Sequence, residues 1–309
     1  MPDAPRRMSL EQIAYHALRH RADPCPFNAD VPIDFSKPFV CPTLTALYYT
    51  SIWKELSPEI QLRHTQLSAL SFNELVASFE DGFSATISAL LQTNRVPQNV
   101  KALLPGFLED ERRHQNMWWA LNRRCAPQRY PRNDASITRI APAGRVLMKW
   151  FAGRPLQFPV VIWVILFLEE HGNEIARRCS VRRPNEIEPH FAAAYLAHVR
   201  DETRHVQIDW HLLDCLWPDL SGWRRALNVW LFRLIIRRLV LRTEHAAMSV
   251  AGELVREYPS LRPLLPRIRR ELREVGNHPE FRAMMFSMES SPITFHLIGK
   301  FPELRSAVA

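Results

Sequence analysis

Two short stretches of this 309-residue chain, DERRH at residues 110–114 and DETRH at residues 201–205, decide the fold that the sequence predicts. In each stretch a glutamate and a histidine stand three positions apart, so on a helix they share one face. One such pair arises by chance in many helices, whereas two copies with the same preceding aspartate and the same intervening arginine are far more specific. One Glu-x-x-His pair from each of two helices, with one glutamate from each of two others, is how a four-helix bundle builds a carboxylate-bridged dinuclear metal site.

The composition favours long helices over a sheet. Only 9 glycines are present, and the 24 prolines fall mostly between segments of helical periodicity, where they end helices. No segment shows the convincing alternation of a half-buried strand. We therefore predict an all-α protein. The expected helices cover residues 9–19, 43–56, 57–93, 106–124, 143–178 (with a break at Pro155 or Pro159), 189–216, 223–257, 264–275 and 278–288, with a short helical piece between Pro97 and Pro105.

Both motifs fall on expected helices, and the long helix that precedes each of them completes a set of four. The predicted architecture is an all-α, ferritin-like four-helix bundle with extra N- and C-terminal helices. Residues 1–56 are expected to form a tail and a wrapping segment, residues 57–216 the four-helix bundle with the dinuclear site, and residues 217–309 helices packed on it. These three parts are expected to make up a single domain overall.

The net charge and the cysteines limit which partners and which cellular environment the sequence predicts. The chain carries 40 basic and 32 acidic residues, a formal net charge of +8. The arginines are spread along the sequence without a zinc-finger spacing or an aromatic RNA-binding signature, so we expect no nucleic-acid partner. Five widely spaced cysteines without a Cys-x-x-Cys pair are typical of reduced thiols in a cytoplasmic protein. No signal peptide is indicated, and the longest apolar run, residues 158–168, is too short to span a bilayer, so no membrane association is expected.

The two remaining glutamates of such a site must come from the first and third bundle helices. In the first helix Glu80 lies against the apolar stripe, whereas Glu74 shares a face with polar residues, so Glu80 is preferred and Glu74 stays the alternative. In the third helix Glu169 shares a face with apolar residues and Glu170 aligns with charged ones, so Glu169 is preferred over Glu170. A carboxylate on an apolar face is costly unless it is paired or bound to a metal, which favours the two preferred residues as ligands.

Each motif also carries candidate support for the ligands of the other. A metal-bound imidazole usually donates its second N–H to a carboxylate, which fixes its tautomer and orientation. If the two motif helices run antiparallel, Asp110 approaches His205 across the bundle. By the same pairing, Asp201 approaches His114. The charges of these aspartates would be neutralised by the motif arginines, Arg113 and Arg204.

His198 sets the two copies apart. It lies four residues before Glu202 and seven before His205, so it shares their helix face, as either an extra ligand or a hydrogen-bonded structural histidine. This His-x-x-x-Glu-x-x-His helix, with Glu111 and His114 on an earlier helix and two single glutamates, resembles the p-aminobenzoate N-oxygenase family of non-haem di-iron enzymes. That family has one histidine ligand beyond the usual set, and His198 matches it in position.

The resemblance implies a definite ligand set and a reaction. The metal ligands would be Glu80, Glu111, His114, Glu169, His198, Glu202 and His205. The cofactor would be two iron ions, with dioxygen as co-substrate. The reduced centre would form a peroxo species and oxygenate the nitrogen of a small-molecule substrate, with aromatic amines as the leading class. Reducing equivalents would come from an external electron donor, because the sequence contains no flavin or ferredoxin module.

Three other interpretations remain open at this level. Related di-iron scaffolds hydroxylate or desaturate carbon centres. Ferritin-like proteins oxidise and store iron, but they are usually shorter and assemble into shells, whereas this chain has large additional segments. A metal-free helical module that binds an acidic partner is the third alternative. A homodimer is a possible assembly, and a mixed manganese–iron site is an alternative to two irons.

Overall fold

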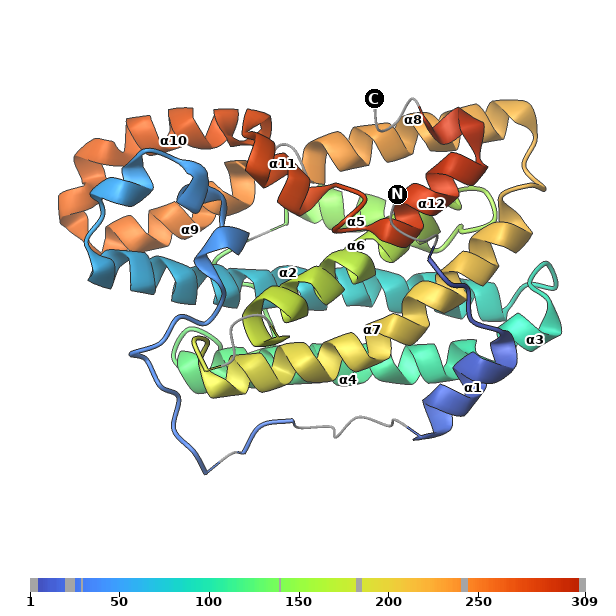
Figure 1. The fold of residues 1–309 in the computed structure, drawn as a ribbon, viewed down its shortest axis with the longest axis horizontal. Coiled ribbons are helices and arrows are strands. Elements are labelled where there is room, and N and C mark those ends of the chain that lie inside the picture. The colour runs from blue at the N-terminus through green and yellow to red at the C-terminus, as the bar shows by residue number, and fades with distance from the viewer. Residues whose placement is uncertain are drawn as a thin grey trace.

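The computed structural model describes residues 5–19, 26–28, 30–138, 140–181, 185–239 and 244–305. Helices dominate this part of the chain, and it contains no β-strand (Figure 1). The four long helices that carry the predicted site form the bundle: α2 (Pro58–Leu91), α4 (Leu104–Cys125), α6 (Val160–Ala176) and α7 (Pro189–Leu216). The predicted fold class, an all-α bundle with extra helices at both ends, is therefore confirmed.

The bundle helices begin where the sequence offers a cap. α2 begins after Ser57, whose Oγ accepts the backbone N–H of Ile60 at 3.4 Å, and Pro58 occupies the first turn, where its missing N–H costs nothing. α7 begins after Glu188, whose carboxylate accepts two backbone N–H groups of the first turn at 2.8 and 3.1 Å. Since a carboxylate at a helix N-terminus also interacts favourably with the macrodipole, the start of α7 is fixed twice over.

The bundle consists of two helix pairs that face each other. α2 packs lengthwise against α4, and α6 packs lengthwise against α7, with further contacts from α4 to α7 and from α2 to α6 (Figure 1). Large aromatic side chains fill the interior, and Trp118, Trp163 and Trp217 are among the largest that are fully buried. Each such side chain removes roughly 150–250 Å² from solvent, so the packing holds the four helices in a fixed register.

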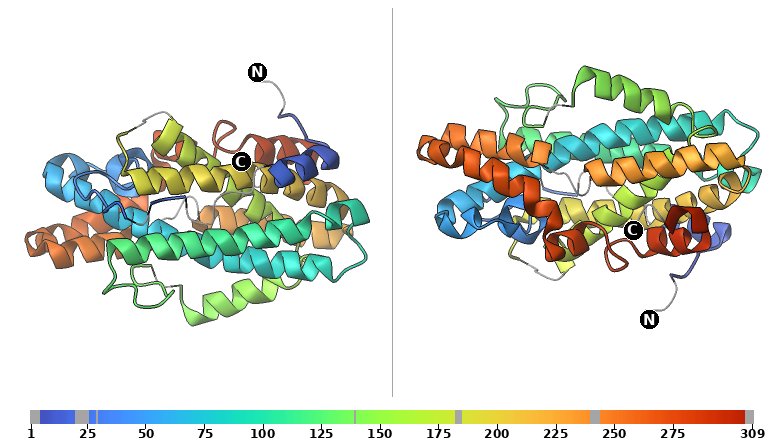
Figure 2. Two further views of the ribbon diagram at one scale, coloured as in Figure 1. Left: turned by 90° about the horizontal axis from the view of Figure 1, so that it is seen from below. Right: turned by 90° about the horizontal axis from the view of Figure 1, so that it is seen from above.

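Shorter helices cover the bundle. Their bounds are α1 (Leu10–Arg19), α3 (Gln98–Lys101), α5 (Pro142–Ala152), α8 (Gly222–Leu239), α9 (Glu244–Glu257), α10 (Leu265–Glu274), α11 (Pro279–Met285) and α12 (Pro292–Lys300). α5 lies along the outer side of α2, and α9 covers another part of α2 with α10 packed on it (Figure 2). α8 packs on α6, α12 contacts both α6 and α7, and α1 contacts α7. The shorter helices thus cover α2, α6 and α7 from outside, and α4 is the bundle helix that they leave least covered.

The predicted helix over residues 43–56 is wrong. The segment forms three short 3-10 turns, Pro42–Leu44, Ala46–Tyr49 and Ile52–Glu55. Thr45 and Thr50 separate the turns, because both have extended backbone angles. Their hydroxyls donate to the carbonyls of Pro42 and Leu47 at 2.8 and 2.6 Å. Side chains that bond to nearby backbone carbonyls compete with the helical ladder, which explains why a helix does not form here.

The N-terminal residues are more firmly attached than a tail. Within residues 5–9, the backbone N–H of Met8 donates to Gln207 Oε1 on α7 at 2.8 Å. α1 then starts with a reciprocal capping box: the Ser9 N–H donates to Gln12 Oε1 at 2.9 Å, and the Gln12 N–H donates to Ser9 Oγ at 3.2 Å. The segment therefore packs on the bundle as soon as the described chain begins.

Proline divides the predicted helix over residues 143–178. It forms α5 and α6, with Pro155 and Pro159 in the break, and α6 continues into a π-helical turn, Arg177–Val181. The helical region predicted over residues 223–257 forms α8 and α9, and residues 240–243 between them lie outside the described residues. α12 was not predicted. None of the helices in the described ranges is both long and apolar enough to cross a membrane.

None of the four cysteines in the described ranges takes part in a disulfide. They are Cys41, Cys125, Cys179 and Cys215, and Cys25 lies outside the described residues. Cys41 and Cys179 are buried together, since the Cys41 N–H donates to Cys179 Sγ at 3.3 Å. Burial raises the pKa of the Cys125 thiol to about 12, so this side chain is protonated at neutral pH. The cysteines thus behave as packing residues.

Candidate metal centre

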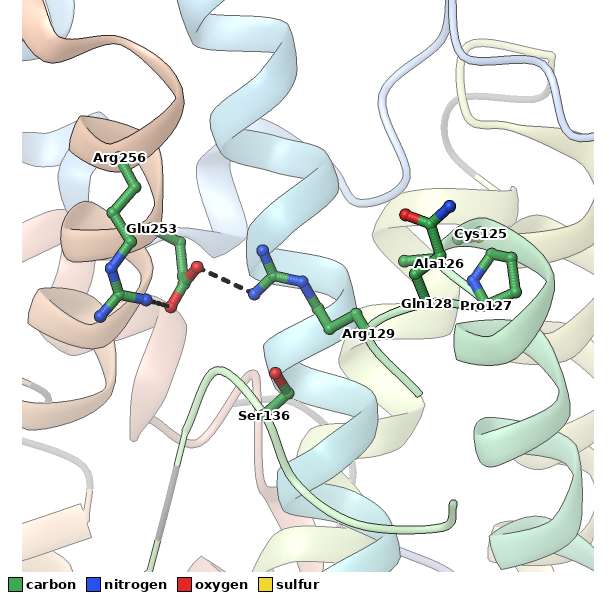
Figure 3. A pocket seen from close by; sticks show the side chains of 8 residues that line it. All are labelled: Cys125, Ala126, Pro127, Gln128, Arg129, Ser136, Glu253 and Arg256. Carbon is green, nitrogen blue, oxygen red and sulfur yellow. Dashed lines mark hydrogen bonds and ion pairs between the residues drawn. The ribbon is translucent and has the colours of Figure 1, made fainter. Parts of the chain in front are cut away.

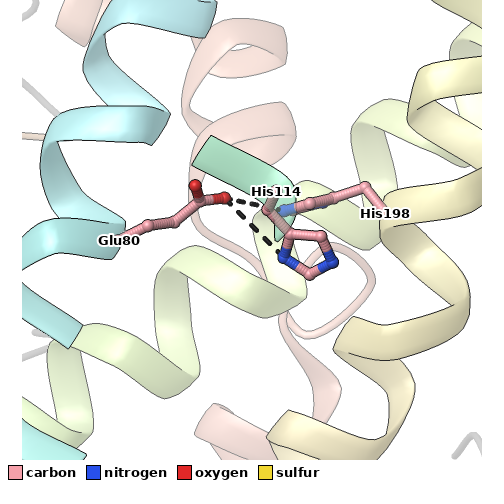
Figure 4. Close-up of side chains that lie close together, drawn as sticks. All are labelled: Glu80, His114 and His198. Carbon is pink, nitrogen blue, oxygen red and sulfur yellow. Dashed lines mark hydrogen bonds and ion pairs between the residues drawn. The ribbon is translucent and has the colours of Figure 1, made fainter. Parts of the chain in front are cut away.

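The motif residues of α4 and α7 meet two glutamates, from α2 and α6, inside the bundle. In three groups of buried residues, one ligand atom from each residue lies within 4.8 Å of the others. The groups are Glu80, His114 and His198 (Figure 4); Glu111, Glu169 and His205; and Glu111, His114 and Glu202. Together they contain all seven residues that the sequence suggested as ligands, and every bundle helix supplies at least one. The structure thus brings the seven side chains together, and their binding of metal remains a prediction.

The first half of the cluster is built around Glu80 on α2. His198 Nε2 lies 3.2 Å from Glu80 Oε1, and His114 Nδ1 lies 3.9 Å from the same oxygen. Figure 4 shows the two imidazoles, from α7 and α4, on one side of this carboxylate. Glu202 closes the group, because its Oε1 lies 3.1 Å from His198 Nε2 and 3.4 Å from His114 Nδ1. Two carboxylates and two imidazoles therefore converge on one small space.

The second half is built around His205 on α7. Its Nδ1 lies 3.2 Å from Glu111 Oε1, 3.7 Å from Glu169 Oε1 and 3.6 Å from Glu202 Oε2. Glu111 also approaches the first half, since its Oε1 lies 3.9 Å from His114 Nδ1. Glu111 and Glu202 thus each approach imidazoles of both halves, Glu202 with a different oxygen toward each. This is the placement that two bridging carboxylates of a dinuclear site require.

Each motif imidazole contacts an aspartate of the opposite motif with the ring nitrogen that faces away from the cluster. Asp201 Oδ2 lies 3.1 Å from His114 Nε2. Asp110 Oδ2 lies 3.2 Å from His205 Nε2. The structure places each aspartate beside the histidine that the sequence suggested, and its role behind a bound metal remains a prediction. Because a carboxylate binds Nε2 of each ring, Nδ1 is the nitrogen that faces the cluster, which is the arrangement found behind metal-bound histidines.

The two motif arginines join both aspartates into one network. Arg113 Nη2 lies 2.7 Å from Asp110 and 2.5 Å from Asp201, and Arg204 Nη2 lies 2.6 Å and 2.8 Å from the same two residues. Burial alone would raise the pKa of Asp110, but the hydrogen bond from His205 and the neighbouring charges outweigh it and lower the pKa to about 2. The pKa of Asp201 is held below its usual range in the same way. Both aspartates are therefore anionic at neutral pH.

Many of the converging atoms lack a hydrogen-bond partner among the described residues. They are Glu80 Oε2, both oxygens of Glu111 and of Glu169, Glu202 Oε2, and the Nδ1 atoms of His114 and His205. A buried polar group without a partner costs roughly 1–3 kcal/mol, and more when it is charged. Carboxylate oxygens and imidazole nitrogens suit iron or manganese, so a pair of such ions would satisfy these atoms together. The donor set therefore fits the two iron ions that the sequence implies.

The pKa values of the clustered glutamates also indicate a site that favours bound cations. Burial raises the pKa of Glu80 to about 8 and that of Glu111 to about 7, and it raises the pKa of Glu169 well above the usual range. Glu202 differs because the surrounding imidazoles, His198 first, outweigh its burial and lower its pKa to about 2. Without a metal, Glu80, Glu111 and Glu169 hold protons near neutral pH while Glu202 does not, and metal ions would take the place of those protons.

The two glutamates that the sequence left as alternatives lie elsewhere. Glu74 is fully buried on α2, but its carboxylate accepts the Tyr130 hydroxyl at 2.7 Å and the backbone N–H groups of residues 136–138 at 2.7–3.1 Å. Glu170 accepts the backbone N–H groups of Ile293 and Thr294 at 2.7 and 2.8 Å, at the start of α12. Both are occupied as structural acceptors, so the geometry favours Glu80 and Glu169 for the cluster.

Two aromatic residues of α4 contact the cluster directly, and the sequence alone did not assign them this role. The indole N–H of Trp118 donates to Glu80 Oε1 at 3.1 Å. The ring of Phe107 stacks on His205 with a centroid distance of 3.8 Å and an interplanar angle of 5°. Phe107 lies four residues before the motif glutamate and Trp118 four after the motif histidine, so extending the motif by one turn each way would have found both.

A glycine on α6 makes room for His198. A Cβ atom placed on Gly172 would lie 3.4 Å from His198 Cε1 and 3.6 Å from its Nδ1. The helix surface at this position therefore touches the imidazole, and any side chain longer than a methyl group would occupy its space. Gly172 stands three residues after Glu169 on the same helix face, a spacing that is visible in the sequence.

An open cavity of about 690 Å³ lies away from the cluster. It is lined by Cys125 at the end of α4, by the loop over residues 126–136 and by α9. Glu253 lies between Arg129 and Arg256 on its wall (Figure 3). Cys125, at its edge, stands eleven residues after His114, which corresponds to about 16 Å along a helix. None of the seven residues of the cluster lines this cavity.

A smaller cavity of about 250 Å³ lies nearer to the cluster. It is lined by α6, Arg177, α7 and residues 289–293. Thr203 and Val206, which line it, directly follow Glu202 and His205 in the sequence. The groove between α6 and α7 thus lies beside the turns of α7 that carry Glu202 and His205.

The fold and the cluster define the class of protein: a ferritin-like four-helix bundle with a buried set of carboxylates and histidines that could hold metal ions. The chain belongs to the p-aminobenzoate N-oxygenase AurF family, whose model matches residues 3–284. The resemblance seen in the sequence is therefore confirmed at the level of the family. This is a family of di-iron oxygenases, which are oxidoreductases. A comparison with curated proteins found no match.

Proposed function

We propose that the protein is a di-iron oxygenase that uses dioxygen to oxygenate the nitrogen of a small amine, with arylamines as the first class to test. Family membership supports the chemistry, and the unpartnered buried ligand atoms carry the proposal for this chain. Glu80, His114 and His198 would hold one iron ion, and Glu169 with His205 would hold the other. The bridging carboxylates would be Glu111 and Glu202.

Two iron ions bound in this way would supply the redox chemistry that activates dioxygen. The chain's own residues orient the ligands and keep the site dry. Asp110 and Asp201 hold the imidazoles with Nδ1 turned inward, so their lone pairs need no rearrangement when metal binds. Trp118 and Phe107 are at most 1% exposed and pack against the ligands, which excludes bulk water from that side.

The proposed substrate is small because the space near the cluster is small. The cavity between α6, α7 and residues 289–293 measures about 250 Å³, enough for a molecule of one aromatic ring with substituents. We propose that the substrate approaches through this groove, since its lining includes Thr203 and Val206 beside the α7 ligands. Each turnover would also need electrons from a separate donor protein.

The test begins with metal content and ends with products. Protein reconstituted with Fe²⁺ without oxygen should bind two irons per chain, and Glu111→Ala and Glu202→Ala should each abolish the pair. Asp219→Ala, at a side chain that is 67% exposed, serves as the matched control and should bind two. The reduced protein, mixed with oxygen and an arylamine, should give a transient absorbance whose decay the amine accelerates, with hydroxylamine, nitroso or nitro products. An iron content far below two per chain, or an unchanged iron content in both glutamate variants, would refute the proposal. Products hydroxylated at carbon would show that the reaction is carbon hydroxylation and not N-oxygenation.

A further inference from the structure

Helix α8 presents apolar side chains on two opposite faces. Its inner face packs on α6 through three buried residues, Val229, Phe232 and Ile236. Its outer face carries four apolar residues that are between 36% and 67% exposed, Trp223, Leu227, Trp230 and Leu234. A helix that is apolar on all sides is normally covered on all sides. The outer face of α8 therefore needs an occupant of its own.

The four exposed residues form one straight row. At roughly 100° per residue, positions 223, 227, 230 and 234 lie within about 60° of one another around the helix axis and extend about 16 Å along it. Figure 1 shows α8 along the upper edge of the molecule, and the view from above in Figure 2 shows no other ribbon over it. The row is thus an open, convex ridge. Single exposed apolar residues are common, but a contiguous row with two tryptophans is typical of an interaction site.

Arginines lie on both sides of this ridge. α8 contains five arginines and no acidic residue. Arg225 turns inward, where its Nε lies 3.4 Å from Glu303. Three others are exposed and form no ion pair with another described residue, namely Arg233, Arg237 and Arg238. Since their charges are not neutralised within the described part of the chain, the occupant of the ridge should be anionic.

The shape and the charge of the ridge narrow the choice of occupant. Two copies of α8 packed on each other would bring arginine against arginine, and the helix has no carboxylate to place between them. A small molecule binds in a concave site, whereas the ridge is convex. The surface of an anionic membrane meets both conditions. Acyl chains accept a convex apolar ridge without a matching shape, and headgroup phosphates neutralise the arginines.

We propose that α8 binds the surface of a membrane that contains anionic lipids, with the ridge at the level where headgroups meet acyl chains. Trp223 and Trp230 suit this depth, because the indole has an apolar ring and a polar N–H. The arginine stems lie with the apolar residues while the guanidinium groups reach the phosphates. The expectation of no membrane association rested on the length of the apolar runs, and a helix that lies on a surface does not need to span the bilayer. This inference is independent of the dinuclear centre.

Co-sedimentation of the full-length protein with lipid vesicles tests the proposal. The protein should bind vesicles made of equal parts of phosphatidylglycerol and phosphatidylcholine, and the binding should weaken as salt is added. Vesicles of phosphatidylcholine alone should bind much less. The double variant Trp223→Gln/Trp230→Gln should bind the anionic vesicles about tenfold more weakly or worse. Arg233→Gln/Arg237→Gln should bind them about 30-fold more weakly, because each arginine near an anionic surface contributes about fivefold.

Matched controls lie on other helices. Leu18→Gln replaces a leucine of α1 that is 81% exposed, and Arg269→Gln/Arg270→Gln removes two exposed charges from α10. Both controls should bind the anionic vesicles as tightly as wild type does. All of these variants should melt at the wild-type temperature, because the substituted side chains are exposed. If the tryptophan pair does not fold, the arginine pair decides the result.

Each contrary outcome has a distinct meaning. Failure of the wild type to bind anionic vesicles, or equal binding by wild type and the ridge variants, would overturn the inference. Equal binding to both kinds of vesicle would overturn the role of the arginines. A dimer that Trp223→Gln/Trp230→Gln dissociates, without vesicle binding, would assign the ridge to a second copy. Binding of polyglutamate without vesicle binding would assign it to an acidic protein, and either result overturns the inference. An iron content below two per chain would overturn the proposed function alone.

Discussion

Asp201 on α7 pairs with His114 on α4 across 87 residues of sequence, with Oδ2 3.1 Å from Nε2. The pairing makes each motif incomplete alone, because the residue that orients its histidine comes from the other copy. Arg113 and Arg204 join the two pairs into one charged layer beside the ligands. The repetition of the pentapeptide is therefore a physical requirement of the site, since either copy without its partner would leave buried charges unpaired.

Asp201→Asn should weaken both the fold and the metal centre. The amide can still accept from His114, but it removes the anion between Arg113 and Arg204, whose side chains are 15% and 7% exposed. Removing one partner of a buried ion pair costs about 3–5 kcal/mol, and loss of an orienting carboxylate lowers metal affinity about 10–100-fold. Chemical unfolding of the metal-free protein and Fe²⁺ titration measure the two effects. Asp219→Asn is the exposed control, and equal results for both variants would contradict the role of the network.

Glu80→Gln and Glu74→Gln should have opposite effects. The carboxylate of Glu74 accepts hydrogen bonds from four N–H or O–H groups. Glu74→Gln should therefore lower the free energy of unfolding by about 1–3 kcal/mol, while the folded variant still binds two iron ions. Glu80→Gln should leave the metal-free protein as stable as wild type, because it removes a buried carboxyl group. The same variant should bind one of the two iron ions more weakly. Unfolding curves and metal analysis of the same samples decide the matter. Loss of metal in the Glu74 variant with none in the Glu80 variant would reverse the assignment.

Gly172 should tolerate alanine but not leucine. The new methyl group would be in ordinary contact with His198 at 3.4 Å, so Gly172→Ala should bind two irons. Gly172→Leu should displace the imidazole and weaken the iron beside Glu80, with a changed Co²⁺ spectrum. Gly252→Leu is the matched control, because no atom lies within 4 Å of a Cβ at that helical position. A leucine variant with the wild-type spectrum would show that His198 is not held at this site.

Metal binding should release protons, and the metal-free protein should lose stability as the pH rises from 5 to 8. The pKa values of Glu80 and Glu111 are raised to about 8 and about 7, so their protonated forms stabilise the fold below pH 4.5 and this contribution is lost as the pH passes 7 and then 8. Asp110, with a pKa of about 2, acts in the opposite sense only below pH 4. Melting curves against pH, and calorimetric titration of Fe²⁺ in two buffers of different ionisation enthalpy, test this. A pH-independent melting temperature without proton release would contradict it.

The spacing of chemically distinctive residues predicted the bundle and most of the cluster. Glu111 and His114 could be placed because a helix fixes which neighbours share a face, and the repetition showed that two such faces meet. Glu80 and Glu169 were harder to place, because Glu74 and Glu170 are buried as well. What separates the alternatives is where the partner groups lie, in the loop over residues 136–138 and in α12, and helical periodicity contains no information on those contacts.

The errors have similar origins. The segment over residues 43–56 has apolar residues at spacings that suit a helix, yet Thr45 and Thr50 bond to their own backbone and divide it into turns. Asp209 was not among the predicted site residues because a single aspartate on a helix is usually exposed, whereas this one is fully buried.

Adjacent glutamates on α6 link the centre of the bundle to the far end of the chain. Glu169 points into the ligand cluster, and Glu170 accepts the first N–H groups of α12. The family model matches residues 3–284, and α12 lies beyond the matched range. A single peptide bond thus separates a residue of the ligand cluster from the anchor of α12. A substitution that displaces the first turn of α12 would therefore act on α6 one residue away from the cluster, without changing a ligand.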